Sequence, residues 1–233
     1  MKNLLYKEFK LSIHPLTYFF MAVMALVCLT PSLPAFVPLL YFAPCYTFLF
    51  IGMNKTTTTN DLFYTCNLPI RRKDVVTARI CSTTLLQIVE IILVFPILAV
   101  SMFGFVKHMP IADMTKALKS FVTIDITQGI YLAAVYLICF GVLDLIYLPW
   151  FYKTGKSIIA NMFVSIIGVI LVGALLTVVP HYIPAFNAAI TVGTAESNYF
   201  LQFGILVCAI GLWIGSKFLV RHLCVKNLVK LDF

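Results

Sequence analysis

Charged residues are scarce in this sequence. They make up 11% of its 233 residues, whereas 61% are hydrophobic, and a soluble domain is usually about a quarter charged and about half apolar. Only 9 residues are acidic, against 17 Lys and Arg, which gives a net charge of +8. One aqueous core cannot hide this apolar excess. The composition therefore excludes an ordinary soluble domain and indicates a surface that faces lipid.

Paired cysteines and the common catalytic motifs are absent as well. The seven cysteines include no C-x-x-C pair, and the sequence contains neither H-E-x-x-H nor G-x-S-x-G. A disulfide framework, a zinc site, a metalloprotease and a serine hydrolase are therefore unsupported. Residues 154–157 resemble the end of a phosphate-binding loop, but Trp150 stands where that motif needs glycine. We therefore expect no catalytic residue, metal ligand or nucleotide site in this chain, which we predict is not an enzyme.

Long apolar runs divide the chain into six predicted membrane spans. A spanning helix needs about 20 apolar residues, and the uncharged stretch between Lys10 and Lys55 is long enough for two, with a turn at Pro31 and Pro34. The predicted spans are roughly residues 16–30, 35–53, 83–105, 127–148, 158–179 and 199–216. The sequence therefore predicts an all-α integral membrane protein with a single transmembrane domain over residues 1–233.

The distribution of positive charge orients this topology. Six spans put both termini on one side, and that side holds all the Lys and Arg residues except Lys107, Lys116 and Lys119. Segments next to a membrane span carry their excess of Lys and Arg on the cytoplasmic side. We therefore predict a multi-pass protein of the cell membrane with both termini in the cytoplasm.

Two segments outside the spans have an apolar character. In residues 2–13, Leu5, Phe9 and Ile13 recur at helical spacing between lysines, which favours an interfacial helix over a solvated lead-in to the first span. Residues 180–198 form a nearly uncharged external loop. Such a loop either caps a transport pathway or packs against the rest of the protein.

Two acidic residues lie within predicted spans. Glu90 and Asp144 each need a partner, water or a proton, because a charge at mid-helix is costly in a membrane. They either line a pathway for a cationic or amphipathic substrate or form interhelical hydrogen bonds. We favour interhelical bonding for Asp144 and keep both readings for Glu90, which has Gln87 one turn away.

Small residues follow one face of the last predicted span. Gly204, Cys208, Gly211 and Gly215 fall at helical spacing, and the last two glycines form a G-x-x-x-G. Such a face lets two helices approach closely. We expect it to pack within the chain rather than against a second copy.

The longest predicted cytoplasmic connection is residues 54–79. Pro69 suits the first turn of a short helix, in which Arg71, Arg72, Lys73 and Asp74 accompany apolar side chains. A helix of this kind under the membrane either docks a soluble partner or touches anionic lipid. The residues alone support both readings equally.

Two stretches resemble a known family. They are Asn60-Asp61-Leu62-Phe63-Tyr64, followed by residues 68–79 (LPIRRKDVVTAR), and the opening residues 3–11 (NLLYKEFKL). Together with six spans, they resemble type 2 ABC-transporter permeases of Gram-positive bacteria. Within that family the chain is similar to the permeases that export phenol-soluble modulins and antimicrobial peptides.

The resemblance implies a half-transporter. Two permease chains, identical or different, would pair in the membrane, and each would bind a separate ATPase subunit that holds ATP and magnesium. The N-terminal segment would be an elbow helix, and loop 180–198 would close the exit. The coupling helix that docks on the ATPase would comprise Leu68, Pro69, Ile70, Arg71, Arg72, Lys73, Asp74 and Val75.

The resemblance also implies ATP-driven export of amphipathic peptides or other lipophilic cargo, with lipid and no nucleic acid as further partners. Two other functions remain open. One is an ion-coupled secondary transporter that uses Glu90 and Asp144. The other is a membrane sensor or immunity scaffold that binds partners and moves nothing.

Overall fold

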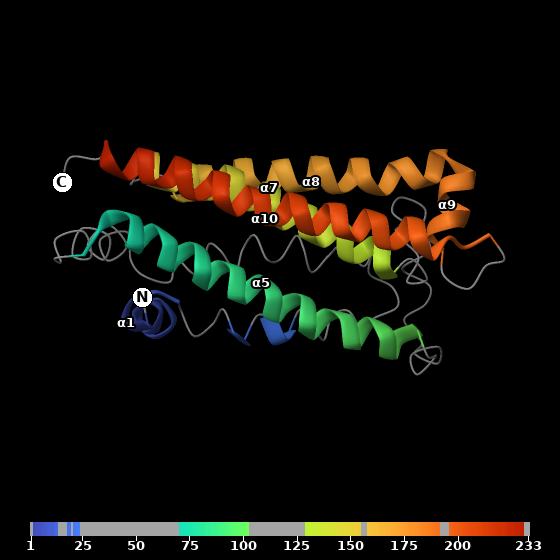
Figure 1. Cartoon of the computed structure of the whole chain (residues 1–233), viewed down its shortest axis with the longest axis horizontal. Coiled ribbons are helices and arrows are strands. Elements are labelled where there is room, and N and C mark those ends of the chain that lie inside the picture. Colours follow the sequence, from blue (N-terminus) through green and yellow to red (C-terminus); the bar gives the residue numbers. More distant parts are fainter. Residues whose placement is uncertain are drawn as a thin grey trace.

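The structure is a computed structural model, and it describes residues 2–13, 18–19, 21–23, 70–102, 129–154, 158–191 and 196–230. These residues are helical apart from short turns, and no strand occurs among them. The prediction of an all-α fold is confirmed for this part of the chain. The named elements (Figure 1) are α1 Lys2–Lys7, the π-helical turn η1 Glu8–Ser12, α5 Arg72–Met102, α7 Gly129–Thr154, α8 Ile158–Tyr182, α9 Pro184–Ile190 and α10 Tyr199–Val229.

Four of these helices are long and apolar enough to cross a membrane. The apolar stretches are Arg72–Leu93, Ile130–Lys153, Ala160–Pro180 and Tyr199–Val229. They overlap the last four predicted spans, although the first begins at residue 72 rather than 83 and the last ends at 229 rather than 216. Their length and composition indicate a membrane protein. The predicted spans 16–30 and 35–53 lie outside the described residues, except for a few helical positions at 18–19 and 21–23, so the count of six spans stays a prediction.

The helices run further than predicted at the end of the molecule that carries most of the positive charge. α5 begins at Arg72 and continues without a break to Met102, so the expected short helix after Pro69 is the first part of a span and not a separate element. α10 continues beyond residue 216 to Val229. Its buried side chains Val220, Cys224 and Leu228 keep the four-residue spacing of a helix face. Packing against the bundle therefore sustains the helix beyond the predicted end of the span at residue 216.

Two prolines do not end their helices. α7 continues past Pro149 to Thr154, and α8 continues past Pro180 to Tyr182. The fifth predicted span, residues 158–179, agrees with the apolar stretch Ala160–Pro180, and only the helix itself runs further, to Tyr182. A proline removes one hydrogen bond of the helix ladder, and its ring crowds the carbonyl group four residues earlier. Each of these prolines lies within the last two turns of its helix, so a bend at the proline displaces only a short segment.

α7 is the central helix. It packs along both α8 and α10, and α5 lies across α10 and α7 on the other side (Figure 1). Large side chains of α7 such as Tyr136, Phe140 and Tyr147 are almost fully buried. α7 and α10 lie close together at Gly141, where an added Cβ atom would lie 3.2 Å from Ser216 Oγ. The absence of a side chain at Gly141 therefore permits the close packing of these two helices at this point.

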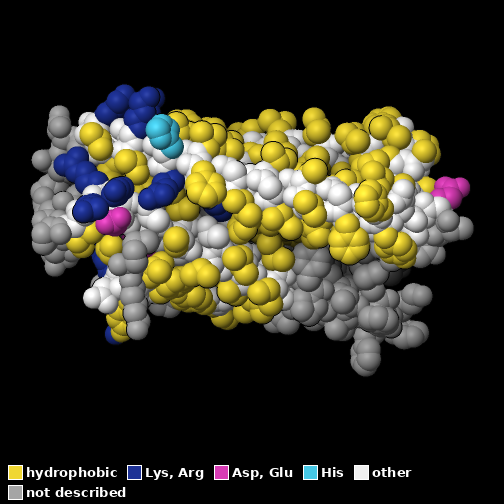
Figure 2. Space-filling model, in the orientation of Figure 1, with side chains coloured by type: hydrophobic (Ala, Val, Ile, Leu, Met, Phe, Trp, Pro, Cys, Tyr) yellow, Lys and Arg dark blue, Asp and Glu magenta, His cyan; other side chains and the backbone are white. Residues whose placement is uncertain are grey.

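The outer surface of the bundle is apolar along its length. On α8, Leu171 is 65% exposed, and on α10, Phe200 is 91% exposed. Figure 2 shows hydrophobic side chains covering the visible length, with Lys and Arg gathered at the end where α10 finishes. Such a surface is costly in water and favourable in lipid. The start of α5 and α1 lie toward the same end of the molecule (Figure 1), as the predicted topology requires.

Candidate functional site

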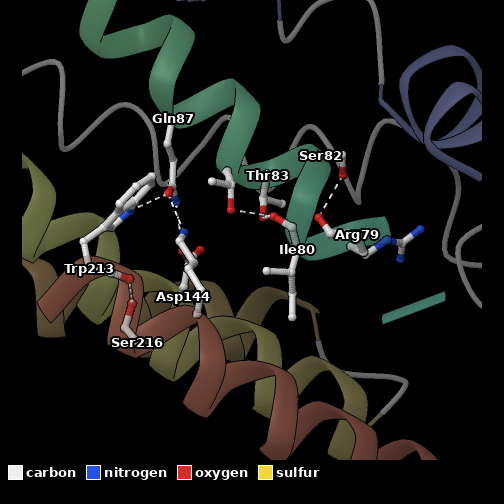
Figure 3. Close-up of polar contacts among 10 residues, drawn as sticks. Arg79, Ile80, Ser82, Thr83, Gln87, Asp144, Trp213 and Ser216 are labelled. Carbon is white, nitrogen blue, oxygen red and sulfur yellow. Dashed lines mark hydrogen bonds and ion pairs between the residues drawn. The ribbon is translucent and has the colours of Figure 1, made fainter. Parts of the chain in front are cut away.

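A buried polar cluster joins α5, α7 and α10 (Figure 3). It consists of Gln87 from α5, Asp144 from α7, and Trp213 and Lys217 from α10. The Asp144 carboxylate forms an ion pair with the Lys217 ammonium and accepts a hydrogen bond from Gln87 Nε2 at 3.0 Å. Three helices that are far apart in the sequence therefore meet at one carboxylate.

Gln87 bridges the cluster through both ends of its amide. Its Oε1 accepts from Trp213 Nε1 at 3.0 Å and from Lys217 Nζ at 2.6 Å, while its Nε2 donates to Asp144. The Lys217 ammonium also lies 4.9 Å from the centre of the Trp213 ring, within the range of a cation–π interaction. Each polar group thus has a partner, which is what a buried polar network needs in order to stabilise a structure.

The cluster places Asp144 in interhelical contacts, which is the role we favoured for it. Asp144 is 0% exposed, so its charge would be costly without the Lys217 ammonium. Lys217 was not predicted as this partner, because it follows the predicted end of the last span at residue 216. A usable signal was present in the predicted topology: Lys217 is the first cation after the last predicted span, and Asp144 lies near the cytoplasmic end of the predicted span 127–148.

A second buried ion pair attaches the N-terminal segment to α5. Glu8 accepts two hydrogen bonds from the Arg79 guanidinium, at 2.9 Å to Nε and 3.1 Å to Nη2. Both side chains are under 10% exposed. Leu4 and Ile13 are buried beside this pair, whereas Leu5 and Phe9 of the predicted apolar stripe are only half-buried. The buried face of this N-terminal segment therefore includes Leu4 and Glu8, which are not part of the predicted apolar stripe.

Glu90 occupies the same inner face of α5, one turn beyond Gln87. Glu90 is 3% exposed, and its Oε2 has no hydrogen-bond partner among the described residues. An acidic group buried in this way needs a proton, a cation or a ligand group to offset the loss of hydration. Among the described carboxyl groups, Glu90 is therefore the one with a buried oxygen that lacks a hydrogen bond.

The predicted docking segment is the exposed beginning of α5. Leu68 and Pro69 lie outside the described residues. Ile70 and Asp74 are half-exposed, and the side chains of Arg71, Arg72 and Lys73 are exposed, whereas Val75 is 2% exposed. The charges therefore point outward from a helix whose apolar side is fixed in the bundle.

The predicted packing face on α10 is open. Gly204, Cys208, Gly211 and Gly215 are all exposed, and a Cβ atom added at any of the three glycines would meet nothing within 4 Å. Their expected packing within the chain does not hold among the described residues. α10 contacts its neighbours through another face instead, which carries Gln202, Ala209, Ser216, Val220, Cys224 and Leu228.

Loop 180–198 is folded back onto α10 through the short helix α9. The backbone oxygen of Ala189 accepts from Asn198 N and from Gln202 Nε2, each at 3.0 Å. Ile190 is 0% exposed, and the ring of Phe186 meets Tyr131 of α7 edge-on at 5.9 Å. The described part of the loop is therefore packed against the bundle, and a role in closing a pathway stays a prediction.

Among the described residues, no three His, Cys, Asp or Glu side chains come together as a metal site would require. Comparisons with family models, with curated proteins and with solved structures found no match to this chain. The functional assignment therefore rests on the sequence resemblance and on the geometry described above.

Proposed function

We propose that this chain is the membrane-spanning permease subunit of an ATP-driven exporter. A separate ATPase subunit docks on the start of α5, and a second permease chain completes the transporter. The cargo is an amphipathic peptide or another lipophilic molecule. The resemblance of residues 60–79 to the coupling segment of type 2 ABC permeases supports this proposal, as does the apolar surface of the bundle.

The observation that carries the proposal is the continuity of α5. The exposed charges of Arg72 and Lys73, directly after Arg71, begin the same 31-residue helix that carries the buried residues Gln87 and Glu90. A helix of this length is about 46 Å long at 1.5 Å per residue. A force applied to its start therefore moves the residues inside the membrane without an intervening hinge.

The mechanism that follows is a change of packing driven from the cytoplasmic end. ATP draws the two ATPase subunits together, and each pulls the start of α5 with it. The polar cluster passes this motion to α7 and α10, because Asp144, Gln87 and Lys217 tie the three helices to one another. ATP shifts the population toward the outward-open state only if the ATPase binds that state more tightly.

The test is co-purification of the tagged chain with its candidate ATPase. Wild type is compared with a variant in which Arg71, Arg72 and Asp74 are all replaced by alanine. A Lys10→Ala variant serves as the control, because Lys10 is an exposed cation of η1 outside the docking segment. We expect wild type and the control to retain the ATPase and the triple variant to lose it. Failure of the wild type to retain the ATPase with or without ATP would refute the proposal.

One observation favours a second candidate, an ion-coupled transporter. The Glu90 Oε2 is buried and lacks a hydrogen-bond partner, as expected for a site that takes up a proton or a cation during transport. In that case transport would follow an ion gradient without ATP, and Glu90→Gln would abolish the coupling. The two candidates are separated by the energy source that the purified protein requires.

A further inference from the structure

The exposed side of α10 stays apolar beyond the predicted end of the last span. Phe218 is 68% exposed, Leu219 is 51% exposed and Val229 is 59% exposed, and the apolar stretch of this helix runs from Tyr199 to Val229. Large apolar side chains on a surface are costly in water and favourable in lipid. The end of α10 therefore keeps the lipid-facing character of the rest of the helix.

Exposed cations share this side of α10. Arg221, Lys226 and Lys230 are exposed, and Figure 2 shows Lys and Arg gathered at the end where α10 finishes. Arg221 follows Phe218 by three residues, so the two side chains are neighbours on the helix surface. Lys226 follows Leu219 by seven residues, which places it two turns further along the same side. Among the described residues, none of these three cations forms an ion pair with a carboxylate.

Contacts with two other helices fix the end of α10 in place. Arg221 Nε donates to Thr77 Oγ1 of α5 at 3.0 Å. Asn227 Nδ2 donates to the backbone oxygen of Pro149 of α7 at 2.8 Å, and Leu228 is 0% exposed. A surface that is ordered before it binds a ligand loses little conformational freedom on binding. The charges and the apolar side chains of this surface are therefore held in one arrangement.

We propose that the exposed side of α10, from Phe218 to Lys230, binds an anionic phospholipid. The ammonium groups of Lys226 and Lys230 meet the phosphate of the headgroup, because basic residues next to a membrane span attract anionic lipid. Leu219 lies about 10 Å nearer the middle of the helix than Lys226, at 1.5 Å per residue. One lipid molecule spans that separation, with its acyl chains against Leu219 and Phe218.

The apolar side chains favour a lipid over an acidic protein as the binding partner. Carboxylates of a soluble protein would offset the charge of the lysines but would give Phe218, Leu219 and Val229 no apolar partner. A phospholipid supplies the anionic group and the hydrocarbon in one molecule, and the lysine stems lie along the apolar surface while their ends reach the phosphate. The inference uses only the surface of α10 and does not depend on the proposed function.

The test measures lipid binding to the full chain, purified in a neutral detergent, by native mass spectrometry. The chain is titrated with phosphatidylglycerol, which is anionic, and with zwitterionic phosphatidylcholine as the reference. Lys226→Gln/Lys230→Gln removes two charges from α10. Arg71→Gln/Lys73→Gln is the charge-matched control, because it removes two exposed cations next to α5. All four side chains are exposed, and a monodisperse elution profile with an unchanged circular dichroism spectrum verifies that the variants are folded.

We expect wild type to bind phosphatidylglycerol at least about tenfold more tightly than phosphatidylcholine. The α10 charge variant is expected to lose about tenfold in affinity for phosphatidylglycerol, and the control less than about threefold. Equal affinity of wild type for the two lipids would overturn the inference and leave the cations to a soluble partner. Equal losses in the two charge variants would also overturn it, because they would show attraction to the whole cationic end rather than a site on α10.

A second variant tests the apolar half of the site. Phe218→Ser/Leu219→Ser changes only exposed side chains and leaves every cation in place. We expect it to weaken the binding of both lipids, because the acyl chains lose their contacts. Unchanged binding of phosphatidylglycerol by this variant would overturn the inference, since the cations alone would then account for the binding.

Discussion

Removal of the Lys217 ammonium is the most informative perturbation of the bundle. Asp144 is 0% exposed and Lys217 is 12% exposed at its side chain, so Lys217→Met leaves a buried carboxylate without its cation. Breaking a buried ion pair in this way costs about 3–5 kcal/mol of folding free energy. Because Gln87 Nε2 still donates to Asp144, we expect a loss near the lower end of that range.

The assay is unfolding of the purified protein by titration with a denaturing detergent, followed by circular dichroism. Asp144→Asn and the double variant Asp144→Asn/Lys217→Met complete a double-mutant cycle, and the exposed Lys10→Met is the control. The double variant is expected to be more stable than the sum of the single losses predicts, with a coupling energy of at least about 2 kcal/mol. Strictly additive losses would refute the assignment of Lys217 as the partner of Asp144.

Three further predictions concern other contacts. Arg79→Lys is expected to destabilise the protein by about 2 kcal/mol or more, because a lysine cannot reproduce the paired hydrogen bonds to Glu8. If the loss of stability were no larger than that of Lys10→Ala in the same detergent titration, this prediction would be wrong. Gly141→Ala is expected to lower the free energy of unfolding by about 1–3 kcal/mol, because the added methyl group crowds α10. Gly211 faces open space, so Gly211→Ala is expected to leave the free energy of unfolding unchanged or to raise it by up to about 1 kcal/mol. Equal effects of the two substitutions would show that the described packing is wrong. A lipid-soluble maleimide is expected to label Cys208 in the chain alone, and weaker labelling in the assembled transporter would show that a second permease chain covers that face.

The helical class of the fold and the positions of four apolar helices were predictable from the sequence. Long uncharged runs have few alternatives to a membrane helix, because no other local structure satisfies every backbone group in lipid. The ends of the helices were less predictable. Beyond Ser216, the packing of Val220 and Cys224 against the bundle continues α10 past the predicted end of the last span.

Some residues of the candidate site were predictable from the sequence, but the residues with which they pair were not. The cost of an acidic residue in a membrane singled out Glu90 and Asp144 without structural information. The pairing of Asp144 with Lys217 and of Glu8 with Arg79 depends on how distant segments lie beside one another, which spacing in the sequence does not determine. The exposure of Gly211 was unpredictable for the same reason. The sequence shows that one helix face carries small residues, but it does not show which neighbouring helix that face meets.

The central claim is that this chain transports cargo with energy from ATP held by a separate subunit. The most direct measurement reconstitutes the chain with its candidate ATPase in sealed vesicles and follows the movement of a fluorescent amphipathic peptide across the membrane. We predict movement that requires ATP, requires both subunits and persists when an ionophore collapses the ion gradients. Movement that continues without ATP and stops with the ionophore would contradict the account and favour the ion-coupled alternative centred on Glu90.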